Sequence, residues 1–184
     1  MSTRQTSEAT IEPMRSEILH RPSGTGRTFW GPGDLYTFLV TGAESGGSYF
    51  TMEALVPPGG GPPPHIHRNE DETFYVVEGQ CRFRLGDDTI TAGAGDFVNI
   101  PRGSVHCFRN EGTTPARLIL TFTPAGIEKF FEETLEPALG PTETPPDNIE
   151  DVVSRYAAEA PRYGIEFLID AAGSMSHPLH EIAP

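Results

Sequence analysis

Two stretches of this sequence decide how it folds: GGGPPPHIHRNEDETFYVVEG, residues 59–79, and GDFVNIPRGSVHCFRN, residues 95–110. They contain four candidate metal ligands: His65, His67, Glu72 and His106. Three imidazoles and one carboxylate form a complete set of protein donors for a divalent transition metal. The glycines and prolines around them supply the turns that could bring the two stretches together.

The spacing of the four residues has a physical reason. Side chains two positions apart in a strand share a face, so His65 and His67 should point the same way. We expect residues 68–71 to form a turn and the next strand to run back antiparallel, which would place Glu72 beside the histidine pair. His106, near the start of another predicted strand, would complete the set from a neighbouring strand.

This donor set is typical of a catalytic metal site. Three neutral donors and one anion would leave an octahedral ion two open positions, whereas structural sites are closed. Nitrogen and oxygen donors suit Fe, Ni, Mn, Co, Cu or Zn, and ligand softness does not choose among them. We therefore predict one divalent transition metal of undetermined identity.

The chain around the two stretches is a series of short β-rich segments separated by Gly, Pro, Asn and Asp. Many short strands at near-regular spacing predict a sandwich or barrel. The segments are residues 35–40, 48–56, 73–77, 81–85, 89–92, 97–100, 105–108 and 116–123.

After Pro124 the apolar residues follow the helical period instead. One helix is predicted at residues 127–135 and a second at 148–159, each with one apolar face. These faces could form a lid or a dimer contact, but we favour the interpretation that they cap an open end of the barrel. The apolar residues 165–169 predict a last short strand. We accordingly divide the chain into an N-terminal arm (1–27), a β-barrel (28–124) and a C-terminal helical cap and tail (125–184).

Composition and charge exclude several classes of partner. The chain has 184 residues and a net charge of −13, and from Ala125 onward twelve acidic residues face three basic ones. Such a surface repels phosphate backbones and anionic lipid, so we expect neither nucleic-acid nor membrane binding. No apolar run approaches the ~20 residues of a membrane span or resembles a signal peptide, so we expect a cytoplasmic protein.

The two cysteines, Cys81 and Cys107, both lie in predicted strands. One disulfide is possible, but a chain of this length does not need one. Strand alternation turns Cys107 away from the face of His106. We predict that both are buried free thiols.

Alternation also predicts the walls of a substrate pocket. Phe74 and Val76 share the face of Glu72, and Phe108 shares the face of His106. The strand at 48–56 could present either Phe50, Met52 and Ala54 or Tyr49, Thr51 and Glu53, and the sequence leaves this register open. The candidate pocket residues are Phe50, Met52, Phe74, Val76 and Phe108.

At ten fixed positions the two stretches resemble the cupin superfamily, whose motifs are G-x5-H-x-H-x3,4-E-x6-G and G-x5-P-x-G-x2-H-x3-N. The matching residues are Gly59, His65, His67, Glu72, Gly79, Gly95, Pro101, Gly103, His106 and Asn110. The resemblance covers residues 35–122. It implies an all-β fold, a double-stranded β-helix or jelly-roll barrel, here with a C-terminal helical cap.

Residues 49–53 and 122–131 are also similar to small single-domain bacterial cupins related to quercetin 2,3-dioxygenase. In that family the three histidines and the glutamate bind the metal, and the glutamate can act as a base toward the flavonol hydroxyl. The resemblance thus implies His65, His67, His106 and Glu72 as ligands, with Glu72 also catalytic. We expect a metal-dependent dioxygenase that acts on a small aromatic or enolisable substrate.

Two other functions stay open. The same metal could serve an isomerase, lyase or cyclase that uses no O₂, or the protein could be a non-catalytic small-molecule-binding cupin. In each case we expect a homodimer formed through the outer strands and the N-terminal arm, because pairing would cover exposed sheet edges.

Overall fold

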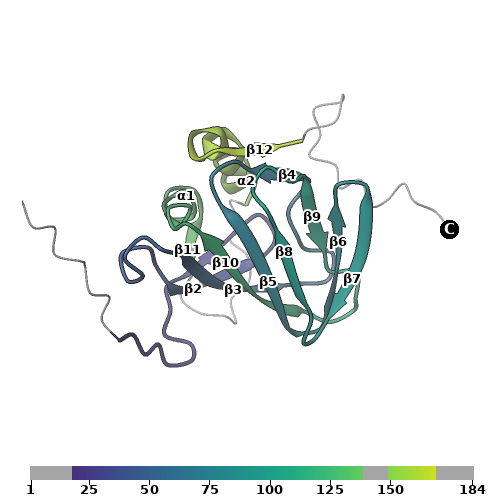
Figure 1. Ribbon diagram of the computed structural model, residues 1–184, viewed down its shortest axis with the longest axis horizontal. Helices are drawn as coiled ribbons and strands as arrows, with labels where there is room; N and C mark the ends of the chain where they lie inside the picture. The colour runs from purple at the N-terminus through teal and green to yellow at the C-terminus, as the bar shows by residue number, and fades with distance from the viewer. Residues whose placement is uncertain (1–17, 139–148, 169–184) are drawn as a thin grey trace, which may run out of the picture.

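The computed structural model describes residues 18–138 and 149–168 and contains two antiparallel β-sheets that face each other (Figure 1). Residues 1–17 of the predicted N-terminal arm lie outside the described residues, as do residues 139–148 and 169–184. The predicted all-β jelly-roll fold with C-terminal helices is confirmed.

The larger sheet has seven strands in the order β11-β1-β2-β3-β10-β5-β8. Their bounds are β11 Glu136–Ala138, β1 Thr28–Trp30, β2 Leu35–Val40, β3 Phe50–Val56, β10 Ala116–Thr123, β5 Asp71–Glu78 and β8 Phe97–Ile100. The smaller sheet has five strands in the order β12-β4-β9-β6-β7. Their bounds are β12 Ile165–Phe167, β4 His65–His67, β9 His106–Arg109, β6 Gln80–Leu85 and β7 Asp88–Gly93.

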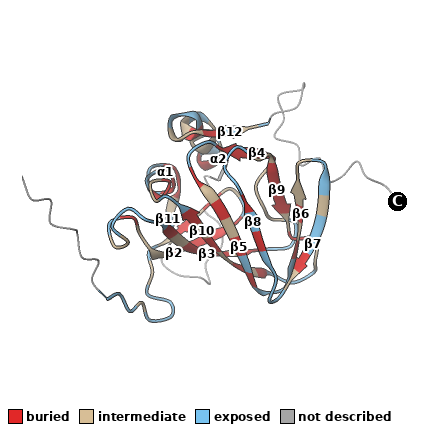
Figure 2. Cartoon of the chain, viewed as in Figure 1, coloured by how far each residue is buried: buried red, intermediate tan, exposed pale blue. Residues whose placement is uncertain are grey.

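The strands of the larger sheet alternate between a buried inner face and a more exposed outer face (Figure 2). In β3 the inner residues include Phe50, Met52 and Ala54, which decides the register that the sequence left open. Glu53 lies on the outer face and forms an ion pair with Arg117 at 3.5 Å. It is therefore not a carboxylate of the barrel interior.

Two strands, β1 and β11, were not predicted. They pair with each other at one edge of the larger sheet. Each has three residues, too few for a periodic signal. β11 also contains Pro137, which in the sequence marks the end of a helix. Proline is tolerated on an edge strand because one side of that strand needs no backbone donor.

The C-terminal segment closes one end of the barrel with helices α1 (Glu128–Thr134) and α2 (Ile149–Glu159) (Figure 1). The Phe131 ring of α1 lies 6.0 Å from those of both Phe50 and Phe122 on the inner face of the larger sheet. Tyr156 of α2 packs on Phe130 at 4.5 Å between ring centroids. These contacts agree with the capping interpretation.

The same segment also extends both sheets. β11 joins the larger sheet, and β12, which follows the 3-10 helix η1 (Ala160–Tyr163), pairs with β4 of the smaller one. The last strand predicted within residues 165–169 is thus present as β12. Cys81 and Cys107 are buried and free, as predicted. Within residues 18–138 and 149–168, no helix is long and apolar enough to cross a membrane.

Candidate metal centre

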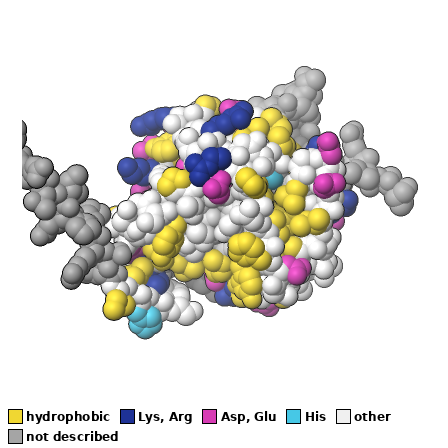
Figure 3. All heavy atoms as spheres, in the orientation of Figure 1, with side chains coloured by type: hydrophobic (Ala, Val, Ile, Leu, Met, Phe, Trp, Pro, Cys, Tyr) yellow, Lys and Arg dark blue, Asp and Glu magenta, His cyan; other side chains and the backbone are white. Residues whose placement is uncertain are grey.

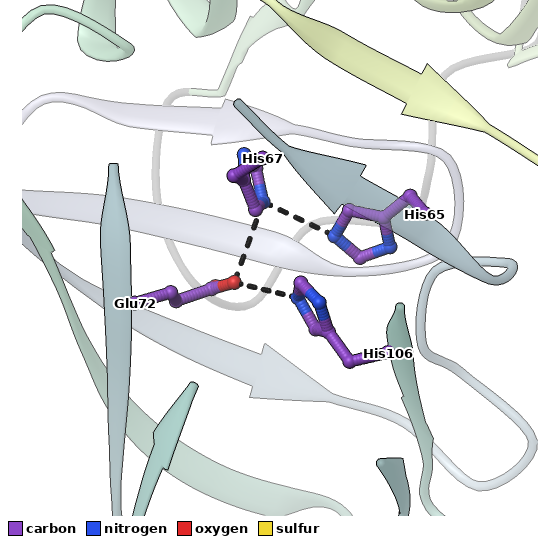
Figure 4. Close-up of side chains that lie close together, drawn as sticks. All are labelled: His65, His67, Glu72 and His106. Carbon is purple, nitrogen blue, oxygen red and sulfur yellow. Dashed lines mark hydrogen bonds and ion pairs between the residues drawn. The ribbon is translucent and has the colours of Figure 1, made fainter. Parts of the chain in front are cut away.

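The four predicted ligands come from three strands and converge on one point inside the barrel (Figure 4). β4 supplies His65 and His67, β9 supplies His106, and β5 supplies Glu72. β4 and β9 are hydrogen-bonded neighbours in which His65 lies opposite His106. The expected approach of His106 from a neighbouring strand is therefore correct.

The predicted route of Glu72 was wrong. β5 does not return beside β4 but belongs to the larger sheet, where it pairs with β10 and β8. Both sides of β4 are already taken, by β12 and by β9, so no position remains for β5. Residues 68–70 instead carry the chain from one sheet to the other, and Glu72 reaches the histidines from the facing sheet.

The donor atoms are spaced as the ligands of one metal ion would be. His65 Nε2 lies 3.1 Å from His67 Nε2, and Glu72 Oε2 lies 3.3 Å from His67 Nε2 and 2.9 Å from His106 Nε2. All four ligand atoms lie within 4.8 Å of one another. Bonds of about 2.1 Å to an octahedral ion would separate adjacent donors by roughly 3.0 Å and opposite donors by roughly 4.2 Å.

Backbone carbonyls set the ring orientation of two histidines. His65 Nδ1 lies 2.9 Å from the oxygen of Pro63, and His106 Nδ1 lies 3.1 Å from that of Ser104. Carbonyl oxygens only accept hydrogen bonds, so each Nδ1 carries the proton and each Nε2 has a free lone pair. Lone pairs of Nε2 then meet those of the Glu72 carboxylate, an arrangement that a cation between them would stabilise.

The site is buried, since the four residues are 1–6% exposed. Burial and the charges of His106 and His67 lower the pKa of His65 well below its usual value. Burial alone would raise the pKa of Glu72, but its close contacts with the His106 and His67 rings outweigh burial and the pKa is lowered. A neutral imidazole and an ionised carboxylate are the forms that bind metal. The donor set thus fits a divalent transition metal.

A second carboxylate, Glu70, lies near His67 and was missed in the sequence. It is 5% exposed, and its charge interacts with His67. Glu70 Oε2 and His67 Nδ1 are both buried, and neither has a hydrogen-bond partner among the described residues. Nothing in the pattern distinguishes Glu70 from the polar residues of the turn around it.

The five predicted pocket residues are all buried in the hydrophobic core. Phe74 and Phe108 pack edge to face, with 5.4 Å between their ring centroids. Their role as substrate contacts stays a prediction. Two aromatic residues outside the predicted set pack against the ligand rings. The ring centroids of Phe122 and His67 are 5.6 Å apart, and those of Phe167 and His65 are 5.8 Å apart.

Known proteins share this sequence pattern and fold. A family model described as the cupin domain matches residues 52–122. The polyketide synthase CurC of Streptomyces cyaneus is 32% identical over 124 residues, which cover 67% of this chain and 75% of CurC. Quercetin 2,3-dioxygenase of Bacillus subtilis is 25% identical over 118 residues, 64% of this chain and 35% of that enzyme.

A solved structure supports the fold. The RmlC-like cupin from Shewanella frigidimarina superposes with a TM-score of 0.52 and 22% sequence identity, covering 62% of this chain and 99% of that one. At this identity the likeness concerns the fold alone. The domain match, the similarity to CurC and the jelly-roll architecture agree, and the chain therefore belongs to the cupin superfamily.

Proposed function

We propose that this cupin is a metal-dependent dioxygenase that acts on a small aromatic or enolisable substrate. The observation that carries the proposal is the buried convergence of His65, His67, His106 and Glu72, whose ligand atoms all lie within 4.8 Å of one another. A divalent Fe, Ni, Mn, Co, Cu or Zn ion held there would supply Lewis acidity and, for the redox-active metals, electron transfer. The partial similarity to quercetin 2,3-dioxygenase supports this choice.

In this proposal Glu72 is the base. Its carboxylate is ionised, buried and directed at the centre of the site, so it can accept the proton of a substrate hydroxyl at Oε2. Loss of that proton converts a phenol or enol to an anion, which reacts more readily with O₂. Phe122 and Phe167 pack against the ligand rings and help to exclude water.

A cyclase, isomerase or lyase that uses no O₂ is the second candidate. One observation favours it: the sequence identity to CurC is 32%, against 25% to quercetin 2,3-dioxygenase. The matched region covers 75% of CurC but only 35% of the dioxygenase. CurC is named a polyketide synthase, and poly-keto chains are enolisable. The same base and the same ligand set would serve either reaction.

Metal analysis and oxygen uptake test the proposal. Natively purified protein should contain about one transition metal per chain and consume O₂ with quercetin or a polyhydroxylated naphthol. Glu72→Gln should abolish uptake, and Glu53→Gln on the outer face of β3 should leave it intact. Full uptake by Glu72→Gln would refute the role of Glu72.

Other outcomes separate the alternatives. Substrate turnover without O₂ consumption would support the cyclase, isomerase or lyase. Protein that contains no metal, and whose stability does not respond to added Fe²⁺, Ni²⁺ or Mn²⁺, would support a non-catalytic binding protein.

We also propose that the protein acts as a cytoplasmic homodimer. Hydrophobic side chains are visible over β5 and β8 on the outer face of the larger sheet (Figure 3). Tyr75 and Phe97, which lie opposite each other on these strands, are 46% and 63% exposed. A second copy packed here would remove them from water.

A further inference from the structure

A further buried carboxylate, Asp34, lines a small cavity of about 30 Å³. Asp34 precedes β2, and the cavity walls also include Tyr36, Pro63, Tyr156 and Phe167. Such a volume holds one or two water molecules or the oxygen end of a larger ligand. None of the four metal ligands lines it.

The cavity shares its walls with the metal centre. The carbonyl of Pro63 accepts the hydrogen bond that orients His65, and the Phe167 ring lies 5.8 Å from the His65 ring. Tyr156 is close enough to both Glu72 and Asp34 that their charges, after burial itself, raise its pKa. The cavity therefore borders the site where the substrate is proposed to react.

Asp34 has an unused hydrogen-bonding atom at this position. Its Oδ2 accepts a hydrogen bond from the Tyr36 hydroxyl at 3.1 Å. Its Oδ1 is buried and has no hydrogen-bond partner among the described residues. Oδ1 lies against Gly60, so closely that a Cβ added to that glycine would come within 2.6 Å of Oδ1. The whole residue is 2% exposed.

No described Lys, Arg or His forms an ion pair with Asp34. Burying a carboxylate without a cation costs several kcal/mol, whereas a protonated carboxyl is neutral and can donate. With Oδ2 occupied by Tyr36, the proton belongs on Oδ1. The cavity then presents one hydrogen-bond donor among aromatic and proline side chains.

The electrostatic surroundings agree with this protonation. Burial raises the pKa of Asp34 to about 7, and the Tyr36 hydroxyl and the polar Gly61 backbone nearby only partly oppose it. Among the described residues, titratable groups that interact with Asp34 include Tyr36 on β2, Tyr156 on α2 and Cys81 on β6. None of them supplies a positive charge.

We propose that Asp34 binds the substrate, donating a hydrogen bond from Oδ1 to a keto oxygen remote from the metal centre. This inference rests on the proposed function and narrows its substrate to aromatic compounds with a hydroxyl group and a separate keto group. Tyr156 and Phe167, which also line the cavity, offer ring surfaces for the aromatic part of such a substrate. A phenol that lacks the second oxygen would leave the Asp34 donor unpaired and bind more weakly.

The experiment compares two matched probes by equilibrium binding. 1-Hydroxyanthraquinone carries the keto oxygens, and 1-hydroxyanthracene lacks them. At about pH 6, Asp34→Leu should weaken binding of the quinone roughly tenfold and leave binding of the anthracene unchanged. Asp34→Asn, which keeps an N–H donor of the same size, should retain most of the affinity.

The pH dependence provides the second readout. Wild-type affinity for the quinone should fall between about pH 6 and pH 8, because an ionised Asp34 cannot donate, and the affinity of Asp34→Asn should not follow that fall. Far-ultraviolet circular dichroism and urea unfolding verify that each variant is folded. An Asp34→Leu protein that is folded and binds the quinone as wild type does would overturn the proposal, as would failure of wild type to bind it.

The two proposals fail in different ways. Asp34-dependent quinone binding without O₂ uptake would remove the dioxygenase and leave the binding role. If oxygen uptake depends on Glu72 but quinone binding does not depend on Asp34, the dioxygenase is supported and the binding role of Asp34 is refuted.

Discussion

Replacement of Asp34 by Asn should remove a loss of stability that the wild-type protein suffers as pH rises from about 4 to 7. Burial raises the pKa of Asp34 from 3.8 to about 7. Below pH 4 the carboxyl is protonated in both the folded and the unfolded chain. Between pH 4 and 7 the unfolded chain ionises while the folded chain retains its proton, so the unfolded state gains stability.

The size of the effect follows from that difference. About three pH units between the two states, at 1.36 kcal/mol each, correspond to about 4 kcal/mol. The loss is complete once pH exceeds about 7, where the folded chain also ionises. An effect of this size is a large part of the stability of an ordinary domain.

The test measures the free energy of unfolding of wild type and of Asp34→Asn at half-unit steps from pH 4 to 8. Unfolding is induced with urea and followed by circular dichroism. Subtracting the two free energies of unfolding cancels the other titrating groups, provided that they lie far from Asp34. Asp71→Asn is the matched control, because a hydrogen bond and ion pair with Arg102 lower the pKa of Asp71 to about 2. Its contribution to stability is lost only as pH falls from about 4 toward 2, so the wild-type minus Asp71→Asn difference should stay flat from pH 4 to 8. A wild-type minus Asp34→Asn difference that stays flat from pH 4 to 8 would refute the argument that Asp34 is buried without a compensating charge.

Three other changes have definite expected outcomes. Gly61→Ala should destabilise the fold by roughly 2–4 kcal/mol in the same urea assay, because φ of Gly61 is +124° and the added Cβ would overlap a backbone oxygen of β9. Unchanged stability would mean that this turn adopts another conformation. Glu70→Gln should lower metal affinity roughly tenfold in a chelator competition, because it removes the negative charge beside His67; equal affinity would show that Glu70 does not support that ligand. Ser at both Tyr75 and Phe97 should convert dimers to monomers in sedimentation velocity, and a wild-type protein that is already monomeric would contradict the predicted homodimer.

Most of the fold could be predicted because its signals are local. Turn residues separate the strands, and the change of period after Pro124 marks the helices. The three-residue strands β1 and β11 could not be found, since they are defined by their pairing and carry no periodic pattern. The partner of β5 was also misjudged, because a short turn such as residues 68–70 can make a hairpin or cross to the facing sheet.

The sequence by itself determined the ligand set of this cupin: His65, His67, Glu72 and His106 are identified by donor chemistry and by spacing within two short stretches. Only the tertiary structure decided that Glu72 reaches the histidines from the opposite sheet, and that Asp34 is buried without an ion pair to any cationic side chain of residues 18–138 and 149–168. The physical reason is that burial and electrostatic environment depend on segments far apart in the chain. Asp34 is enclosed by Gly61 and Tyr156, which no local pattern connects to it.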